Sequence, residues 1–309
     1  MKATIYKSTG SWYTAKTETG ERWQCRVAGK MKIDEQITST NPVAVGDQVI
    51  LEPEEAGEQT AVITEILPRT NYIVRASPRH RYRKHIVAAN LDQAVLIVTL
   101  REPRTSQGFV DRFLVSAAAY HVAALLVVNK SDLHRAKERE QFARWQAMYG
   151  LMHYPILLAS ALQGEGLDAV REALAGRRSL LAGHSGVGKS TLINDLIPGQ
   201  DLRTQQVSEA SGKGLHTTTF AEMFSLPSGG QVIDTPGLRE LGIVEMEKSE
   251  LSHYFLDMRP YLADCRFNNC LHVNEPGCGV KRAVADGHIN VARYESYLSM
   301  LETLGSPGW

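Results

Sequence analysis

Long hydrophobic runs are missing from this chain. Its longest apolar stretches, such as residues 122–128, fall far short of the roughly 20 residues that an α-helix needs to cross a bilayer. Residues 1–16 also lack the apolar core of a secretory signal. We therefore expect a cytoplasmic protein that makes no contact with a membrane.

An excess of charge of either sign is missing too. The 309 residues include 34 lysines and arginines and 34 aspartates and glutamates, so the formal net charge is zero. A surface that binds nucleic acid must then arise from local segregation of charge. Hydrophobic residues make up 43% of the chain, which excludes wholesale disorder, and the length predicts two or three domains.

Cysteine is scarce, with four in the chain, so a disulfide framework is excluded. Three of the four lie within fourteen residues together with one histidine: Cys265, Cys270, His272 and Cys278. Three thiolates and one imidazole form the closed tetrahedral donor set that structural zinc prefers. We predict one zinc ion there, which holds the C-terminal segment together and leaves no ligand position open for catalysis.

Residues 1–68 alternate short β-type segments with turn signals such as Glu18-Thr19-Gly20-Glu21. The number and the length of these segments predict a small all-β barrel. A five-stranded oligonucleotide-binding (OB) barrel and an SH3-like barrel fit this pattern almost equally well.

Residues 69–90 contain six lysines and arginines and no acidic residue, with Tyr82 among them. We interpret this segment as a basic linker. It is either a solvated connector or an arm that contacts phosphates, in which Tyr82 stacks on an exposed base. The concentration of positive charge in a neutral protein favours the arm.

From residue 91 to residue 242, apolar strands alternate with helical stretches. This alternation predicts an α/β domain whose mostly parallel sheet is covered by helices on both faces. The expected strands span residues 94–100, 123–128, 156–159, 179–182, 220–226 and 231–234. The expected helices lie near residues 108–121, 135–149, 165–175 and 189–197.

The tail, residues 243–309, is expected to form a mainly helical zinc-binding domain. Two apolar stripes with helical spacing predict the faces that pack in its core. One stripe consists of Leu251, Tyr254, Phe255 and Met258, and the other of Val291, Tyr294, Leu298 and Leu301.

A phosphate-binding loop, G-x-x-x-x-G-K-[ST], follows the fourth expected strand and opens a helix, which is the context that this motif needs. Its glycines let the backbone wrap the phosphates, while the loop N–H groups and the helix N-terminus face the anion. Lys189 would reach the β- and γ-phosphate oxygens, and Ser190 would offer its hydroxyl to Mg²⁺. The candidate residues are Gly183, His184, Ser185, Gly186, Val187, Gly188, Lys189, Ser190 and Thr191.

An Asp-x-x-Gly pattern follows the last expected strand. It predicts the carboxylate of Asp234 beside the magnesium ion and the backbone N–H of Gly237 near the γ-phosphate. A glycine-containing loop, residues 212–219, lies between the two phosphate motifs. Its threonines, with Thr219 as the candidate site residue, can supply a second hydroxyl to Mg²⁺ when the γ-phosphate is present.

The segment Asn129-Lys130-Ser131-Asp132 directly follows the strand expected at 123–128. The carboxylate of Asp132 can accept hydrogen bonds from the ring N–H and the exocyclic amine of guanine. Adenine lacks this pair of donors, so the motif specifies guanine. Asn129 would brace neighbouring loops, and Lys130 would lay its stem over the base.

Ser160 and Ala161 follow the next strand and match the short loop whose backbone N–H meets the guanine oxygen, although this dipeptide means little without the other motifs. Base recognition thus precedes phosphate recognition along the chain, whereas small GTPases have the opposite order. The domain is therefore interpreted as circularly permuted, which preserves the sheet if the old termini lie close together. The tail is then joined directly to the nucleotide-sensing loop.

The order of these motifs, ending in Cys-x4-Cys-x-His-x5-Cys, resembles the family of permuted ribosome-assembly GTPases called RsgA or YjeQ, over essentially the whole chain. The resemblance implies an OB barrel at the N-terminus and hydrolysis of GTP to GDP and phosphate. It implies that the small (30S) ribosomal subunit stimulates this reaction late in its own maturation. It also implies that the barrel and the zinc domain contact 16S ribosomal RNA, and we expect a monomer.

Leu238 stands where Ras-like enzymes have a glutamine that orients water. The family pattern places a histidine in the loop before the metal-binding threonines, so His216 is the candidate catalytic residue; the alternatives are that it packs or contacts RNA. Two other interpretations of the whole chain remain open. One is an RNA-binding assembly chaperone that uses GTP only as a conformational ligand, and the other is a permuted GTPase of the large subunit.

Overall fold

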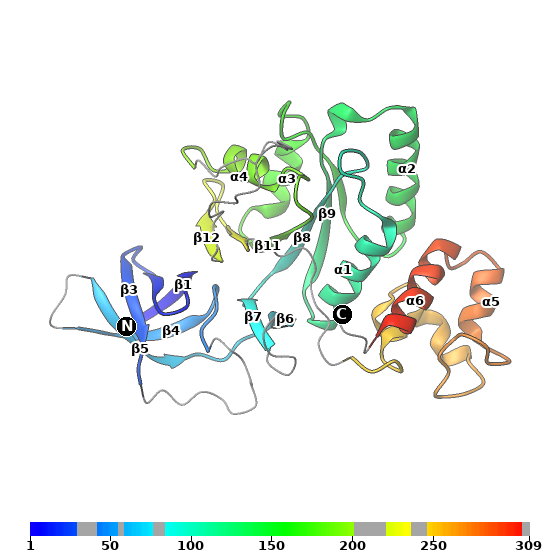
Figure 1. Ribbon diagram of the computed structural model, residues 1–309, viewed down its shortest axis with the longest axis horizontal. Coiled ribbons are helices and arrows are strands. Elements are labelled where there is room, and N and C mark those ends of the chain that lie inside the picture. The colour runs from blue at the N-terminus through cyan, green and yellow to red at the C-terminus, as the bar shows by residue number, and fades with distance from the viewer. Residues whose placement is uncertain (30–41, 55–58, 77–83, 201–220, 236–245, 305–309) are drawn as a thin grey trace, which may run out of the picture.

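The computed structural model describes residues 1–29, 42–54, 59–76, 84–200, 221–235 and 246–304. These residues form a β-barrel, an α/β domain and a small C-terminal domain, and the α/β domain lies between the other two (Figure 1). Within these ranges, no helix has both the length and the apolar character needed to span a membrane.

Five strands form the N-terminal barrel: β1 (Lys2–Ser8), β2 (Tyr13–Thr17), β3 (Arg22–Val27), β4 (Gln48–Pro53) and β5 (Thr60–Ile66). Strand β1 pairs with both β2 and β4, so the sheet closes in the order β1-β2-β3-β5-β4. Strands β3 and β5 are parallel, and the alternating side chains of Ile5, Val49 and Ile63 fill the interior. This strand order is that of an OB barrel, which decides between the two barrels that the sequence left open.

The described parts of the basic segment, residues 69–76 and 84–90, are more ordered than a solvated connector. Strands β6 (Tyr72–Ala76) and β7 (Lys84–Ala89) pair antiparallel, and Ile73 and Ile86 are buried. Arg69 binds the buried carboxylate of Asp47 through two hydrogen bonds of 2.6 and 2.7 Å. Arg69 is therefore a structural residue of the barrel and no part of a phosphate-contacting arm, while residues 77–83, with Tyr82, lie outside the described residues.

The α/β domain contains six strands: β8 (Gln93–Val98), β9 (Ala123–Val128), β10 (Ile156–Leu158), β11 (Arg178–Ala182), β12 (Glu222–Ser225) and β13 (Gln231–Asp234). Their order is β10-β9-β8-β11-β13-β12. The first five are parallel, and β12 is antiparallel to β13. All six lie where the apolar runs predict them, because parallel strands that are covered on both faces need nearly continuous apolar sequence.

Helices cover both faces of this sheet, as expected. They are α1 (Gln107–Ala119), α2 (Ala136–Gly150), α3 (Leu167–Leu174) and α4 (Lys189–Leu196), and a 3-10 turn, η1 (Ser131–Leu133), precedes α2. Leu96 of β8 packs in the core under α1 and α2, and its neighbour Ile97 packs in the core under α3 and α4. The sheet thereby brings the carboxyl ends of five parallel strands to one edge.

The barrel is attached to the outer strand of this sheet. Lys7 of β1 lies opposite Glu222 of β12, and their side chains form an ion pair of 2.8 Å. The backbone N–H of Ser8 donates to the carbonyl of Ala221 at 3.4 Å. The barrel therefore contacts the α/β domain one strand away from β13, which ends at Asp234.

The C-terminal domain consists of η2 (Leu251–Tyr254), η3 (Arg259–Asp264), α5 (Gly279–Ala285) and α6 (Val291–Thr303). The first apolar stripe is buried as predicted at Leu251, Phe255 and Met258. The second stripe is wrong at Val291, whose exposed fraction is 57%. Helix α6 instead turns Tyr297 toward the core, because this face of the helix packs against α1 and η2.

A buried ion network joins the C-terminal domain to the α/β domain. Arg293 of α6, which is 1% exposed, donates to Asp111 of α1 at 2.7 Å and binds both carboxylate oxygens of Asp257 at 2.9 and 3.1 Å. The hydroxyl of Tyr149 in α2 donates to Asp111 at 2.8 Å. The guanidinium also lies 4.7 Å from the ring centre of Phe255. The side chain of Arg293 thus connects α6 with α1 of the α/β domain and with the turn between η2 and η3.

We expect Arg293→Ala to lower the free energy of unfolding by about 3–5 kcal/mol, because removing one partner leaves buried carboxylates without their cation. Urea denaturation measures this change. Arg282→Ala is the matched control, since it breaks a pair with Asp264 whose side chains are 63% and 52% exposed, and it should cost about 1 kcal/mol or less. Equal losses in the two variants would contradict a structural role for the network.

Candidate nucleotide site and metal centre

The phosphate-binding loop runs from the end of β11 at Ala182 to the start of α4 at Lys189. Two of its positions require glycine. A Cβ atom on Gly183 would lie 2.3 Å from the carbonyl oxygen of Ile97, and one on Gly188 would lie 2.4 Å from the amide nitrogen of Asn129. Both residues also have positive φ angles, of 146° and 93°. Glycine therefore lets this loop pass close to β8 and to the base-recognition motif.

Lys189 and Asp234 form the charged part of the site. The ammonium of Lys189 donates to the carbonyl of Gly183 at 2.7 Å, so this side chain folds back over the loop. Asp234 ends β13, the strand beside β11. Burial raises the pKa of the Asp234 carboxyl and lowers the pKa of the Lys189 ammonium, and the charge of each group opposes the shift of the other.

Two buried oxygens beside the phosphate loop have no hydrogen-bond partner among the described residues. They are one carboxylate oxygen of Asp234 and the hydroxyl of Thr235. Buried polar atoms are almost always paired, and carboxylate oxygens are ligands that Mg²⁺ and its bound water accept. These residues, with Ser190 and Thr191 in the first turn of α4, therefore fit a magnesium ion with phosphates.

Asn129 joins the two halves of the site. Its side-chain nitrogen donates to the carbonyl of Val187 in the phosphate loop at 2.8 Å. Its side-chain oxygen accepts from the backbone N–H of Ala161 at 2.9 Å. Asn129 is 1% exposed, and the brace that the sequence predicts for it is present.

The other members of this motif follow in the turn before α2. The hydroxyl of Ser160 donates to the carboxylate of Asp132, which fixes the orientation of that group. The ammonium of Lys130 donates to the carbonyl of Glu102 at 2.6 Å. Sequence reasoning missed Glu102, since a backbone carbonyl contributes no recognisable side-chain pattern.

The structure gathers the predicted residues at one edge of the sheet. Asn129, Ser160 and Gly183 each follow a different parallel strand, and the carboxyl ends of such strands form the ligand-binding crevice of open α/β sheets. The ring of His184 in the loop packs on Phe109 of α1, with centroids 3.8 Å apart. The remaining candidates, His216, Thr219 and Gly237, lie outside the described residues.

The four residues of the predicted metal site also lie together. Their donor atoms are all within 4.8 Å of one another. The sulfurs of Cys265 and Cys278 are 3.9 Å apart, and the Nδ1 atom of His272 lies 3.5 Å from the first and 3.3 Å from the second. A tetrahedral ion with zinc–sulfur bonds of about 2.3 Å places two sulfur ligands about 3.8 Å apart. The cluster of Cys265, Cys270, His272 and Cys278 can therefore hold one zinc ion.

The surroundings of this cluster support metal binding. Tyr294 and Tyr297 of α6 donate to the carbonyls of His272 and Leu271 at 2.6 and 2.8 Å, which fixes the loop that carries the ligands. Burial lowers the pKa of His272 and so favours the neutral imidazole that a metal requires. Cys278 also caps α5 by accepting from the backbone N–H of Lys281.

Comparison with known proteins identifies the family. The RsgA GTPase family model matches residues 66–244, and the RsgA N-terminal domain model matches residues 2–63. The chain belongs to the RsgA GTPase family. A small ribosomal subunit biogenesis GTPase RsgA from Bacteroides fragilis is 48% identical over 302 residues, which cover 98% of this chain and 96% of that protein.

Solved structures of this family agree with the fold. The crystal structure of YjeQ from Thermotoga maritima superimposes with a TM-score of 0.79 at 36% identity and covers 98% of both chains. The structure of YloQ, described as a circularly permuted GTPase, gives a TM-score of 0.74 at 28% identity and covers 98% of this chain and 94% of that one. As an RsgA GTPase, the chain is a GTP-hydrolysing enzyme with a circularly permuted GTPase domain.

The hypothesis that Asp132 reads guanine predicts a switch of base preference. In Asp132→Asn an amide donor replaces one carboxylate acceptor and can meet the 2-oxo group of xanthine, while the bond from Ser160 is retained. We expect GTP affinity to fall about a hundredfold and XTP binding to appear, because a mismatched polar group is left unpaired. Competition binding with labelled nucleotides measures both. Asp168→Asn, on the exposed face of α3, is the control, and unchanged GTP binding in Asp132→Asn would refute the assignment.

Zinc removal, or Cys270→Ala, should unfold the C-terminal domain and leave GTP affinity nearly unchanged, because the metal cluster shares no residue with the nucleotide site. Zinc quantitation and limited proteolysis of the tail test this. Cys25→Ala, which alters a buried cysteine of the barrel, should keep its full zinc content. The metal assignment fails if protein purified without chelators contains almost no zinc.

Proposed function

We propose that this enzyme hydrolyses GTP on the maturing small (30S) ribosomal subunit, which stimulates the reaction, and that it is released afterwards. The observation that carries this proposal is the likeness, over 98% of the chain, to proteins named for biogenesis of that subunit. The barrel supports it, since OB barrels are a common platform for single-stranded RNA.

Asp132 reads the guanine base in this proposal, and Asn129 keeps the base half and the phosphate half of the site in register. Lys189 binds the β- and γ-phosphates, and Ser190 and Asp234 hold the magnesium ion directly or through water. When bound, Mg²⁺ neutralises charge on these phosphates. The burial of Lys189 and Asp234 supports the assignment, because charge interactions are stronger away from water.

His216 is the proposed catalytic residue, which orients the attacking water. It belongs to the segment between α4 and β12, and β12 begins at Glu222. Glu222 lies directly opposite Asp234 in the sheet, so this segment leads into the strand beside the proposed magnesium ligand. Leu238 has no polar group that could orient the attacking water, so a residue at another position must do so.

Stimulation by the subunit requires a physical connection between RNA and the nucleotide site. The barrel provides one candidate, since Lys7 pairs with Glu222 at 2.8 Å. RNA that moves the barrel would act on β12 and on the segment that carries His216. The zinc domain provides a second, because Arg293 joins it to α1. We propose that the zinc ion is structural and keeps this domain folded for RNA contact.

Multiple-turnover phosphate release tests the proposal, with 30S subunits, with 50S subunits and without either. We expect 30S subunits alone to raise the rate. Stimulation by 50S subunits would favour the large-subunit alternative, and an absence of turnover under all conditions would favour the chaperone.

In the same assay, His216→Ala should bind GTP almost normally and lower the 30S-stimulated kcat by about 10²-fold, within the range of a positioned catalytic group. His121→Asn is the control. His121 is exposed and lies just before the amino-terminal end of β9, whereas the candidate site residues follow the carboxyl ends of the strands. If His216→Ala turns over at the wild-type rate, water is oriented by a backbone group or by the ribosome.

A further inference from the structure

His134 lies two residues after Asp132, and the catalytic proposal does not use it. The turn of the base-recognition motif, η1, spans Ser131–Leu133, and the backbone N–H of His134 closes this turn by donating to the carbonyl of Ser131 at 3.0 Å. Helix α2 begins two residues later, at Ala136. His134 therefore joins the turn that carries Asp132 to the start of α2.

The imidazole of His134 is buried without a hydrogen-bond partner. The residue is 9% exposed, and neither Nδ1 nor Nε2 has a partner among the described residues. A neutral imidazole has one donor and one acceptor, and buried polar groups of this kind are almost always paired. An unpaired imidazole lowers the stability of the fold, so its presence next to the base-recognition turn requires an explanation.

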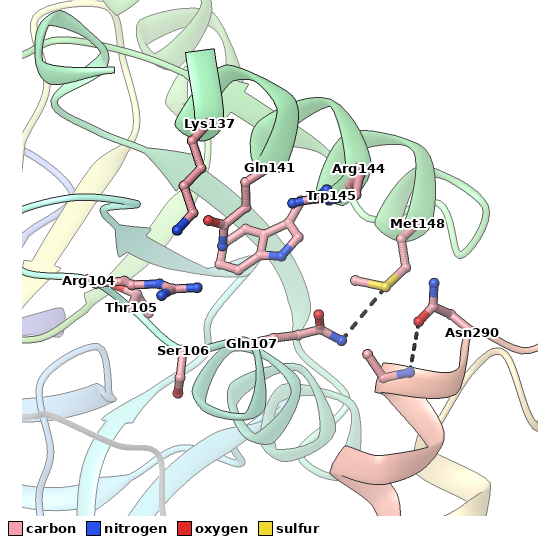
Figure 2. A pocket seen from close by; sticks show the side chains of 11 residues that line it. Arg104, Thr105, Ser106, Gln107, Lys137, Gln141, Arg144, Trp145, Met148 and Asn290 are labelled. Carbon is pink, nitrogen blue, oxygen red and sulfur yellow. Dashed lines mark hydrogen bonds between the residues drawn. The ribbon is translucent and has the colours of Figure 1, made fainter. Parts of the chain in front are cut away.

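A ligand in the neighbouring pocket does not supply the missing partner. This pocket has a volume of about 590 Å³ and lies between the loop that leads into α1, helix α2 and the start of α6. Figure 2 shows Lys137, in the first turn of α2, among the residues that line it. Neither His134 nor any residue of the Asn129–Asp132 motif lines this pocket. Because both ring nitrogens of His134 are buried, water reaches them only when the surrounding atoms move.

Charged groups face the imidazole from three elements. Asp132 lies in the turn, Glu138 and Arg139 lie at the start of α2, and Arg101 reaches the turn from the loop after β8 through a hydrogen bond of 3.4 Å to a backbone carbonyl. Burial is the main cause that lowers the pKa of His134, and Arg139 adds to it, while the carboxylates of Glu138 and Asp132 oppose it. The imidazole is therefore neutral in this arrangement at neutral pH.

Glu138 is fixed as an ionised neighbour of this imidazole. Its carboxylate accepts from the backbone N–H of Arg135 at 2.9 Å, and this bond is the main cause that lowers the pKa of Glu138. The same bond caps the start of α2. When the pH falls below neutral, Glu138 therefore stays ionised and the proton is taken up by His134.

We propose that His134 is a positioning residue for guanine recognition: its neutral ring keeps the turn of Asp132 closed, and uptake of a proton opens the turn and weakens nucleotide binding. A charged imidazole is not stable where it has no hydrogen-bond partner, so it moves toward water. The turn moves with it, because the N–H of His134 closes that turn, and Asp132 is displaced from the ring N–H and the amine of guanine. This inference rests on the proposed role of Asp132.

Proton binding and nucleotide binding then oppose each other. In the open turn the imidazole has the ordinary histidine pKa of about 6.5, whereas burial in the closed turn lowers its pKa. A fall in pH through this range therefore favours the open turn, and guanine binding favours the closed one. An imidazole with a pKa of about 6.5 is about nine-tenths protonated at pH 5.5, so the linkage limits the loss of affinity from pH 7.5 to about tenfold.

Binding of a fluorescent GDP analogue with Mg²⁺ to the whole chain, measured at pH 7.5 and at pH 5.5, tests the proposal. We expect acidification to cost the parent about three- to tenfold more affinity than it costs His134→Gln or His134→Leu, since neither variant can take up the proton. His253→Gln is the matched control: it removes an exposed histidine of the C-terminal domain, and it should lose affinity as the parent does. Protonation of the phosphates of the nucleotide affects all four proteins equally and cancels in the comparison.

NMR of the parent chain with ¹⁵N-labelled histidine gives a second measurement that does not depend on a well-folded variant. The ring signal of His134, identified by its absence in either variant, is titrated with pH with and without GDP. We expect a lower pKa in the GDP complex. The inference is overturned if both variants lose as much affinity as the parent, or if GDP leaves the pKa of His134 unchanged. Unchanged GTP binding in Asp132→Asn at neutral pH would instead refute the role of Asp132 itself.

Discussion

The side-chain amide of Asn129 is the contact on which the nucleotide site depends. It donates to the phosphate loop at Val187 and accepts from the backbone of Ala161, so it joins segments that follow three different strands. Because both ends of one rigid amide are engaged and buried, the base half and the phosphate half of the site keep a fixed distance. The glycine at position 188 is part of the same arrangement, since a Cβ there would occupy the space of the Asn129 amide.

The two flanking domains are attached to the α/β domain by different kinds of contact. Arg293 is fully buried and bonded to two carboxylates, and breaking such a pair costs on the order of 3–5 kcal/mol. Lys7 and Glu222 are partly exposed at 35% and 29%, and such a pair contributes roughly 0–1 kcal/mol. The C-terminal domain is therefore joined to α1 through a buried ion network. The barrel instead combines an exposed ion pair at β12 with a hydrogen bond from Arg178 of β11 to the carbonyl of Gly46 at 3.0 Å.

The C-terminal domain also illustrates what a metal supplies to a short segment. Its helix α5 has seven residues, and two of its four elements are 3-10 turns, so regular hydrogen bonding alone provides little stability. The cluster around Cys265 and His272 compensates, because a bound zinc ion would fix ligands from η3 through to α5. The hydroxyls of Tyr294 and Tyr297 then tie α6 to the same loop, which places Arg293 for its contact with Asp111.

The sequence by itself determined the strands of the sheet, the motif order and the donor set of the metal site. These features depend on local patterns, such as apolar runs in β8 and β9 or the spacing of Cys270 and His272, and local patterns are visible in a one-dimensional chain. Only the tertiary structure decided that the barrel closes as an OB barrel, that Arg69 binds Asp47, and that Arg293 joins the C-terminal domain to α1. Each of these results joins residues that are far apart in the chain, and their energy comes from burial and pairing that arise only after the segments have packed together.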